Sequence, residues 1–381
     1  MYRTLTVCSF AALDALPEHA LNMLSAAGDE CFFDGLPWFQ SLSRHALDAG
    51  DQVRIYCVED VPRSEGFQLI LPMLVRNTPR RLWKPRKLCS LSNYYSSLFG
   101  PVSNGNIVPK TAEELMRTIA SESPRWDQIE LRPLDHDSRS FRLLVESLQA
   151  AGYVVQTYFC FGNWYLKVQD RNYEQYFLGL PAILKNTVNR KQKKLAKSGR
   201  AKLEIVTGGN LLDYAIEAFE SVYRASWKTP EPYPEFVPGL IRMCAKTGAL
   251  RLGLIHVDGQ PAAAQLWIVQ NRSALIYKLA YDERFEELSV GTILTAALMK
   301  HVIDVDKVAE VDYLTGDDAY KKNWMSHRRE RWGILAMNPR TPLGALAILR
   351  HVGGRAIKRA LTSMSRAGIG SLMPERKSTA G

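Results

Sequence analysis

The chain has 381 residues, of which 46% are apolar and 23% are charged, enough to form the buried cores of two domains. No apolar run approaches the ~18 residues that a membrane-spanning helix needs, and the N-terminal segment contains acids and no clear cleavage site, which argues against a signal peptide. The six cysteines are scattered without a CxxC pair, which argues against a zinc site or a disulfide framework. We therefore expect a cytoplasmic protein with no metal ion.

The net charge of +10 is concentrated at the C-terminal end. Residues 338–381 carry eight basic residues and one acid, which leaves +3 for the rest of the chain. Apolar clusters alternate there with Arg and Lys, a pattern typical of a helix on an anionic membrane surface. Gly353-Gly354 interrupts this pattern, so a disordered tail or one that packs on a domain is the alternative.

Apolar periodicity in the first half predicts strands and helices in a mixed order. We expect strands at 5–10, 52–60, 67–76 and 127–134, helices at 11–27, 37–49, 110–120 and 138–151, and a closing pair of strands at 153–160 and 163–168. A Pro-, Gly- and Asn-rich region, Ser90–Pro109, precedes the third helix.

The same order begins again after a helical stretch, Tyr173–Ser198. We expect a strand at 203–208, helices at 211–227 and 236–247, a three-strand meander at 250–257, 261–270 and 274–282, a helix at 292–303, and strands at 310–316 and 329–337. The Asp258-Gly259 turn between two apolar runs favours a hairpin. The repeated order predicts a mixed α/β fold with domains at 1–168 and 169–337 and a tail at 338–381.

A loop that ends in Ser289-Val290-Gly291-Thr292 precedes the helix of the second domain. Ser289 can cap the helix, and Gly291 lets a ligand approach the backbone closely. Backbone amides at a helix N-terminus suit phosphate. The alternative is a Ser-capped helix start that needs no ligand.

The double order and several segments resemble the GNAT acyltransferase superfamily, in the tandem form of FemAB-like and CelD/BcsL-type acetyltransferases. The resemblance covers nearly the whole chain and is densest in LAYDERFEELSVGTIL, DYLTGDDAYKKNW and LPAILKNTVNRKQKKLAKSG, while SNYYSSLFGP in the first half also looks like a family segment. It implies two tandem GNAT-like domains with the acyl-CoA N-acyltransferase fold. The first domain has no convincing phosphate loop, so we expect it to serve as a scaffold or as the acceptor side.

The resemblance implies that residues 289–292 cradle the pyrophosphate of coenzyme A. It also implies that the strand through Leu314 splays from its neighbour and grips the donor's amide-rich arm. The family's usual loop has more glycine and often Arg or Gln at its start, whereas this chain has Glu286 and Glu287. We expect acyl-CoA as a co-substrate and no tightly bound cofactor, and the two glutamates leave another donor open.

Three residues near the strand at 310–316 are the candidate catalytic groups. FemAB-like transferases have a similar aromatic-Lys segment, which implies that Lys321 stabilises developing oxyanion charge while Tyr320 protonates the leaving group. Asp317 is the candidate base, on condition that burial raises its pKa. In the alternative picture Tyr320 and Trp324 anchor the core and the lysine is solvated.

Three further residues are candidates for binding the acceptor. Trp227 closes a helix that borders the acceptor cleft in this fold, although core packing would explain it equally well. Gln265 lies on a central strand and either lines the cleft or satisfies a neighbour. Asp282 ends a strand, where a carboxylate accepts hydrogen bonds from the following loop.

Segment Lys185–Lys202 contains eight cations and no acid, with an apolar stripe through Leu184, Val188 and Leu195. A solvated helix face is the usual meaning of such a run. An anionic partner is the alternative: an acyl carrier protein, an anionic lipid or tRNA, with no DNA expected.

These features and the resemblance predict acyl transfer from acyl-CoA to an amine or hydroxyl, at a cytoplasmic or inner-membrane-peripheral location. The resemblance alone implies that the acceptor is a saccharide or a cell-envelope precursor. Two alternatives stay open. The first is FemAB-like aminoacyl transfer from charged tRNA. The second is a non-catalytic, membrane-peripheral factor that binds glycolipid in polysaccharide synthesis.

Overall fold

The computed structural model describes residues 4–61, 66–77 and 84–351. Its α-helices include α1 Glu18–Glu30, α2 Leu36–His45, α3 Pro109–Ser121, α4 Arg139–Ala150, α5 Tyr173–Leu178, α6 Ala182–Ser198, α7 Leu212–Arg224, α8 Phe236–Lys246 and α9 Val290–Asp304. Its strands are β1 Thr4–Phe10, β2 Gln52–Val61, β3 Phe67–Val75, β4 Lys87–Ser90, β5 Val102–Ser103, β6 Gln128–Asp135, β7 Val154–Lys167, β8 Ala201–Val206, β9 Leu250–Val257, β10 Gln260–Gln270, β11 Ser273–Tyr281, β12 Glu310–Asp312 and β13 His327–Met337.

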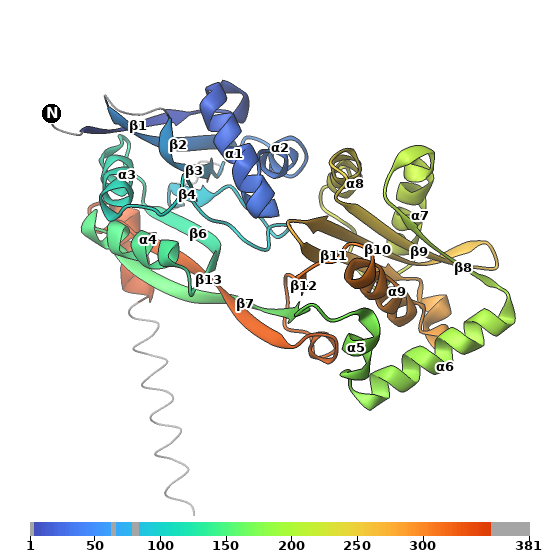
Figure 1. The fold of residues 1–381 in the computed structure, drawn as a ribbon. Coiled ribbons are helices and arrows are strands. Elements are labelled where there is room, and N and C mark those ends of the chain that lie inside the picture. The colour runs from blue at the N-terminus through green and yellow to red at the C-terminus, as the bar shows by residue number, and fades with distance from the viewer. Residues whose placement is uncertain (1–3, 62–65, 78–83, 352–381) are drawn as a thin grey trace, which may run out of the picture.

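The strands of the described residues form one continuous sheet that runs the length of the molecule (Figure 1). Their spatial order is β1-β2-β3-β4-β6-β13-β7-β12-β11-β10-β9-β8, with β5 beside β3. Most neighbours are antiparallel, but β4 pairs with β6 and β11 with β12 in parallel. The mixed α/β fold predicted from the sequence is therefore confirmed.

The two halves of the chain exchange strands at the middle of this sheet. Strand β13, the last one described, lies between β6 and β7 and pairs antiparallel with both. The far end of β7 in turn pairs with β12, from Tyr165 to Lys167. In Figure 1 β7 and β13 cross together from one half to the other. The turn between the halves, Gln169-Asp170, has positive φ at both residues.

The prediction of two short strands at 153–160 and 163–168 is wrong, because these residues form the single long strand β7. A pair would require the chain to reverse near Gly162, but β13 pairs with β7 from Met337 to His327 along its length. Gly162 lies close to Arg328 and Asp317, where a Cβ atom would be 2.7 Å from either side chain. Its glycine thus allows close packing and does not form a turn.

Most other predicted elements agree with the structure to within four residues, but the helix predicted at 11–27 begins only at Glu18. Two further differences stand out. The helical stretch at 173–198 is divided into α5 and α6, because Pro181 lacks the N–H that a continuous helix needs. The short strands β4 and β5 were not predicted; β4 ends at the start of the Pro-, Gly- and Asn-rich region, and β5 lies within it.

One hydrophobic core extends from the first half into the face of the second half covered by α7 and α8. Trp38 of α2 joins the halves, because its ring packs edge-on against Phe236 of α8 and Tyr277 of β11, with centroids 5.9 and 6.3 Å apart. A second core lies between the opposite face and α5, α6 and α9. The predicted stripe on α6 is confirmed, since Val188 is buried there and Leu184 and Leu195 pack beside it.

A cleft opens between β11 and β12. These strands pair only from Ser273 to Leu275 and then diverge, which confirms the expected splay. Strand β11 also carries a bulge: Ile276 and Lys278 oppose consecutive residues of β10, so that Tyr277 has no opposite partner.

Among the described residues, no helix is long and apolar enough to cross a membrane. Most of the basic tail, residues 352–381, lies outside the described residues. The prediction of a membrane-surface helix there stays a prediction.

The strand exchange generates the first testable prediction. Residues 1–168 expressed alone lack β13, so that β6 and most of β7 lose their shared neighbour and leave long unpaired edges. We expect this fragment to show no cooperative unfolding transition by circular dichroism, and co-expression with residues 169–381 to restore one. A sharp transition for the isolated fragment would contradict the strand exchange.

Candidate functional site

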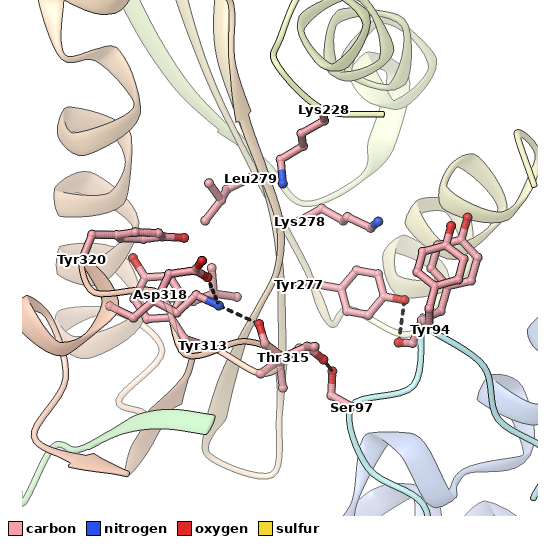
Figure 2. Close-up of a pocket in the computed structure, with 14 residues that line it drawn as sticks. Tyr94, Ser97, Lys228, Tyr277, Lys278, Leu279, Tyr313, Thr315, Asp318 and Tyr320 are labelled. Carbon is pink, nitrogen blue, oxygen red and sulfur yellow. Dashed lines mark hydrogen bonds and ion pairs between the residues drawn. The ribbon is translucent and has the colours of Figure 1, made fainter. Parts of the chain in front are cut away.

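A polar cavity of about 220 Å³ lies in the cleft between the diverging strands (Figure 2). Strand β11 and the segment after β12 form its two walls, and residues 94–97 of the first half lie across it. Its lining comprises Tyr94, Tyr95, Ser97, Lys228, Ile276, Tyr277, Lys278, Leu279, Tyr313, Leu314, Thr315, Asp318, Tyr320 and Lys321. Both halves of the chain therefore build this site.

Glu231 fixes the side of the cavity nearest the first half. Its carboxylate accepts hydrogen bonds from the hydroxyls of Tyr94 and Tyr95, the latter at 2.7 Å, and from Lys278 Nζ at 2.6 Å. Burial raises the pKa of Glu231, but the hydrogen bonds from Lys278 and the surrounding tyrosines outweigh it and lower that pKa to about 2. Glu231 is therefore a permanent anion that holds the two halves together, and it cannot act as a base near neutral pH.

Lys321 lies on the opposite side of the cavity, at the start of the short helix η5 Lys321–Asn323. The residue is 5% exposed. Its Nζ donates to the carbonyl of Thr315 at 2.6 Å and lies 3.0 Å from Asp318 Oδ2. The solvated lysine of the alternative picture is thus not what the structure shows, and the amino group is fixed at the cavity.

Lys228 provides an amino group without an acidic partner among the described residues. It follows α7 and projects toward the cavity from above Lys278 in Figure 2. Its Nζ lies 5.5 Å from the ring centroid of Trp227. Burial lowers the pKa of Lys228, and the positive charge of Lys278 lowers it further. An anionic group in the cavity would relieve this repulsion.

Tyr320 and Trp324 do not share one role. Trp324 is buried in the second core, as the packing interpretation predicted. Tyr320 is 44% exposed and lines the cavity, edge-on to Tyr313. Burial of its hydroxyl and the nearby charge of Asp318 raise the pKa of Tyr320 to about 12, so this hydroxyl stays protonated and can donate.

The condition set for Asp317 as a base, a pKa raised by burial, is not met. The hydrogen bonds that Arg328 donates lower this pKa, with a further contribution from Trp164, and 43% of the side chain is exposed. Its carboxylate faces β7 and β13 and does not line the polar cavity. Asp318, the next residue, lines the cavity and pairs with Lys321.

The expected phosphate loop lies apart from the cavity lining. Ser289 precedes α9 as predicted, but its side chain makes no capping hydrogen bond, so the capping prediction is wrong. Instead its backbone adopts the left-handed conformation, with φ 56°. Gly291 lies against the ring of Tyr281, where a Cβ atom would be 3.3 Å away. Val290 is buried and Thr292 partly exposed.

The three candidate acceptor-binding residues lie in different environments. Gln265 is buried and donates to Gly291 O and Thr295 Oγ1, so it satisfies neighbours beneath the loop. Asp282 is buried and accepts from the backbone N–H of Arg284, which confirms its predicted role in the loop. Trp227 is 51% exposed and packs on Tyr281, with ring centroids 4.7 Å apart. Of these three, only Trp227 presents a surface beside the cavity.

The corresponding cleft in the first half is filled by its own chain. Strands β4 and β6 pair in parallel from Lys87 to Cys89 and then diverge. The hydroxyls of Ser90 and Ser92 donate to Arg132 O, at 2.8 and 2.5 Å, and Phe99 N donates to Pro133 O at 2.7 Å. The backbone that a ligand would need there is already paired with segment 90–99.

The family model of the acetyltransferase (GNAT) domain matches residues 184–322, which contain the polar cavity's second-half residues. Residues 184–322 are therefore a GNAT domain. Among solved structures, FemX is similar over 86% of this chain and 96% of that chain, with a TM-score of 0.56 and 11% identity. A tandem GNAT protein from the clavulanic acid biosynthesis pathway is similar over 89% of this chain and 100% of that chain, with a TM-score of 0.50 and 14% identity. No curated protein matches the sequence.

The solved structures confirm a tandem GNAT fold, and the acetyltransferase (GNAT) domain at residues 184–322 supports an acyltransferase enzyme. At 11% and 14% identity the two solved structures establish the fold alone. The identities of the acyl donor and acceptor therefore have to be inferred from the geometry of the site.

The sequence interpretation missed much of the cavity lining. Tyr94 and Tyr95 belong to SNYYSSLFGP, which was noted only as a family segment, and Glu231 belongs to the Pro-rich segment after Trp227. Lys228 and Lys278 carried no motif. Two adjacent tyrosines in a loop, and a lysine inside an apolar strand, were the available signs.

Some cations of the basic segment Lys185–Lys202 have acidic partners that the sequence did not reveal. Arg200 pairs with Asp258 and Lys202 with Glu204, acids that come from other segments. Lys191 donates to the carbonyl of Glu287 in the loop before α9. Four exposed cations of α6 form no ion pair with a described residue: Arg190, Lys193, Lys194 and Lys197.

The Glu231 cluster generates the second prediction. Because its pKa lies below the ordinary value of 4.5, ionised Glu231 stabilises the fold above that pH, and the contribution is lost as pH falls toward 2. Glu231→Gln should lower the free energy of unfolding by about 2–3 kcal/mol at pH 7. Urea unfolding should show the same difference in the free energy of unfolding between the two proteins at pH 7 and pH 5, and a smaller difference at pH 3. An equal difference at all three pH values would contradict the stabilising role of ionised Glu231.

Proposed function

We propose that the protein transfers an acyl group from acyl-CoA to an amine or hydroxyl of a saccharide or cell-envelope precursor, at the cavity between β11 and β12. The single observation that carries this proposal is the placement of Lys321, Tyr320 and an unpaired Lys228 around one cleft in the sheet. On the β11 side of the cleft, the backbone beyond Leu275 no longer pairs with β12 and can bind an extended, amide-rich donor.

The geometry supports a route for the donor from α9 to the cavity. The first amides of α9, at Val290, Gly291 and Thr292, lack partners within the helix and suit phosphate. Tyr281 lies between Gly291 and Trp227, and Leu279 of the same strand lines the cavity. Glu286 and Glu287 are exposed, so their side chains are free to turn away from a bound pyrophosphate.

Within the cavity, two residues suit acyl transfer. Lys321 places a positive charge where a carbonyl oxygen would become negative, and such a donor stabilises the transition state more than the ground state. The Tyr320 hydroxyl keeps its proton near neutral pH and is available to the departing thiolate. Asp318 replaces Asp317 as the carboxylate positioned to accept the acceptor's proton.

The acceptor in this proposal enters from the side of the first half. Tyr94 on that side and Trp227 of the second half offer exposed aromatic surface, which suits a sugar ring. Lys228 would bind an anionic group of the acceptor, such as a phosphate or a carboxylate. The closed cleft of the first half supports an acceptor or scaffold role for residues 1–168.

Aminoacyl transfer from charged tRNA is the second candidate, and one observation favours it. The four unpaired cations of α6 lie on a helix whose Lys191 contacts the loop before α9. A polyanion bound to α6 would thus approach the same cleft. An acyl carrier protein or an anionic lipid would use the same face. Because the chain is an acyltransferase, the non-catalytic alternative is set aside.

The third prediction separates the donors. Under the acyl-CoA proposal, coenzyme A and acetyl-CoA raise the unfolding temperature in a concentration-dependent way, because a ligand that binds only the folded state stabilises it. Replacing the four unpaired cations of α6 with alanine should change the coenzyme A dissociation constant by no more than about twofold, since exposed charges contribute little to a local contact. A shift with tRNA alone, lost in the fourfold variant, would establish the alternative donor.

The fourth prediction concerns Lys321. Lys321→Ala should reduce kcat by about 10²–10³-fold, the effect of removing one oxyanion-stabilising donor. Lys322→Ala is the matched control, because it removes the same charge from an adjacent exposed residue, and it should leave kcat within about twofold. Acetyl transfer to an acceptor panel would be measured alongside urea unfolding; equal activity of the two variants would contradict the assigned role.

A further inference from the structure

A second charged cavity, of about 240 Å³, lies at the junction of the two halves. Strands β6, β7, β11, β12 and β13 all contribute to its lining, together with the short helix η2 Phe32–Asp34. Ser97 and Leu314 line both this cavity and the cleft described above. The hydrogen bond between the hydroxyls of Ser97 and Thr315, 2.9 Å long, lies at that boundary.

Arg329 pairs with two acids and an amide of the cavity wall. Its Nε donates to Asn163 Oδ1 at 2.6 Å, and its Nη2 donates to carboxylates of Glu310 and Asp312. Asp312 also accepts from Asn163 and from Leu314 N. The guanidinium offsets one of the two carboxylate charges, and its Nε and Nη2 are already used within the protein.

Arg331, two residues further along β13, is different. Its side chain is 5% exposed, and its Nη1 lies 3.3 Å from Asp135 Oδ2. The alignment is outside hydrogen-bond geometry, so this buried nitrogen has no hydrogen-bond partner among the described residues. A buried guanidinium with an unused donor is costly, because water or a protein acceptor normally satisfies it. The cavity beside it offers the space for such an acceptor.

The acids around Arg331 restrict what that acceptor can be. Asp135, Glu310 and Asp312 line the cavity with the two arginines, and Glu30 stands exposed at its edge. A simple anion would be repelled by the carboxylates whose charge Arg329 does not neutralise. A molecule that carries a positive group beside its carboxylate would satisfy both, because a guanidinium binds carboxylate with matched geometry and the free acids attract an ammonium.

We propose that this cavity binds a small amino-carboxylate, with the carboxylate on Arg331 and the ammonium toward Asp135 and Glu30. The volume is below the roughly 300 Å³ at which pockets for drug-sized ligands begin, and it suits a compact molecule of the size of an amino acid. The site is separate from the proposed transfer site and does not depend on the proposed function.

Isothermal titration of the full-length protein with glycine and L-alanine tests the proposal, with acetate and methylamine as probes that carry one charge only. Glycine or L-alanine should bind at least about tenfold more tightly than either single-charge probe. Arg331→Gln should weaken their binding by about 10–100-fold, the range for one hydrogen bond to a charged group. Lys228→Met, in the other cavity, is the matched control and should bind as the unchanged protein does.

Asp135→Asn keeps the proposal testable if Arg331→Gln fails to fold, because the Asp135 side chain is 43% exposed and its replacement is nearly isosteric. This variant should lose affinity for glycine and keep that for acetate. Four results would overturn the proposal: no binding of either amino acid, unchanged binding in Arg331→Gln or in Asp135→Asn, acetate bound as tightly as glycine, or binding that Lys228→Met abolishes.

Discussion

The insertion of β13 between β6 and β7 is the constraint on which the rest of this structure depends. A strand from the end of the described chain completes the sheet of the first half, and β7 continues across to complete that of the second. Backbone hydrogen bonds must all be satisfied in a buried sheet, so neither half can move far without breaking a ladder. The two halves consequently form one rigid support for residues contributed by both.

This shared support explains why two similar halves have different roles. In the first half, segment 90–99 fills the gap between diverging strands and pairs with the backbone there. The same segment then presents Tyr94 and Tyr95 to the open cleft of the second half, where Glu231 fixes them. The closed cleft thus supplies one wall of the open one. A polar site enclosed by protein on several sides is in contact with less bulk water. The interactions of its lysines with other charges are therefore stronger than in water.

The sequence predicted the features that depend on nearby residues and missed those that depend on contacts between distant segments. Apolar periodicity located nearly every helix and strand, and the repeated order supported the tandem fold, since both depend on residues close in sequence. The region 153–168 was misjudged because Gly162 resembles a turn residue until β13 is known to pack against it. Asp317 was misjudged for a similar reason: Arg328, which lowers its pKa, lies on a neighbouring strand.

The sequence by itself determined the mixed α/β class and the duplicated element order, and its resemblance to a known family pointed to Tyr320 and Lys321, which line the cleft. Only the tertiary structure decided that β13 joins the first half, that Glu231 fixes the two tyrosines, and that Lys228 and Arg331 are left without full partners. The periodicity of side chains along the chain encodes the fold class and the order of the elements. The features that only the tertiary structure decided depend on strand pairings and desolvation among residues more than a hundred positions apart, for which a single sequence carries no direct trace.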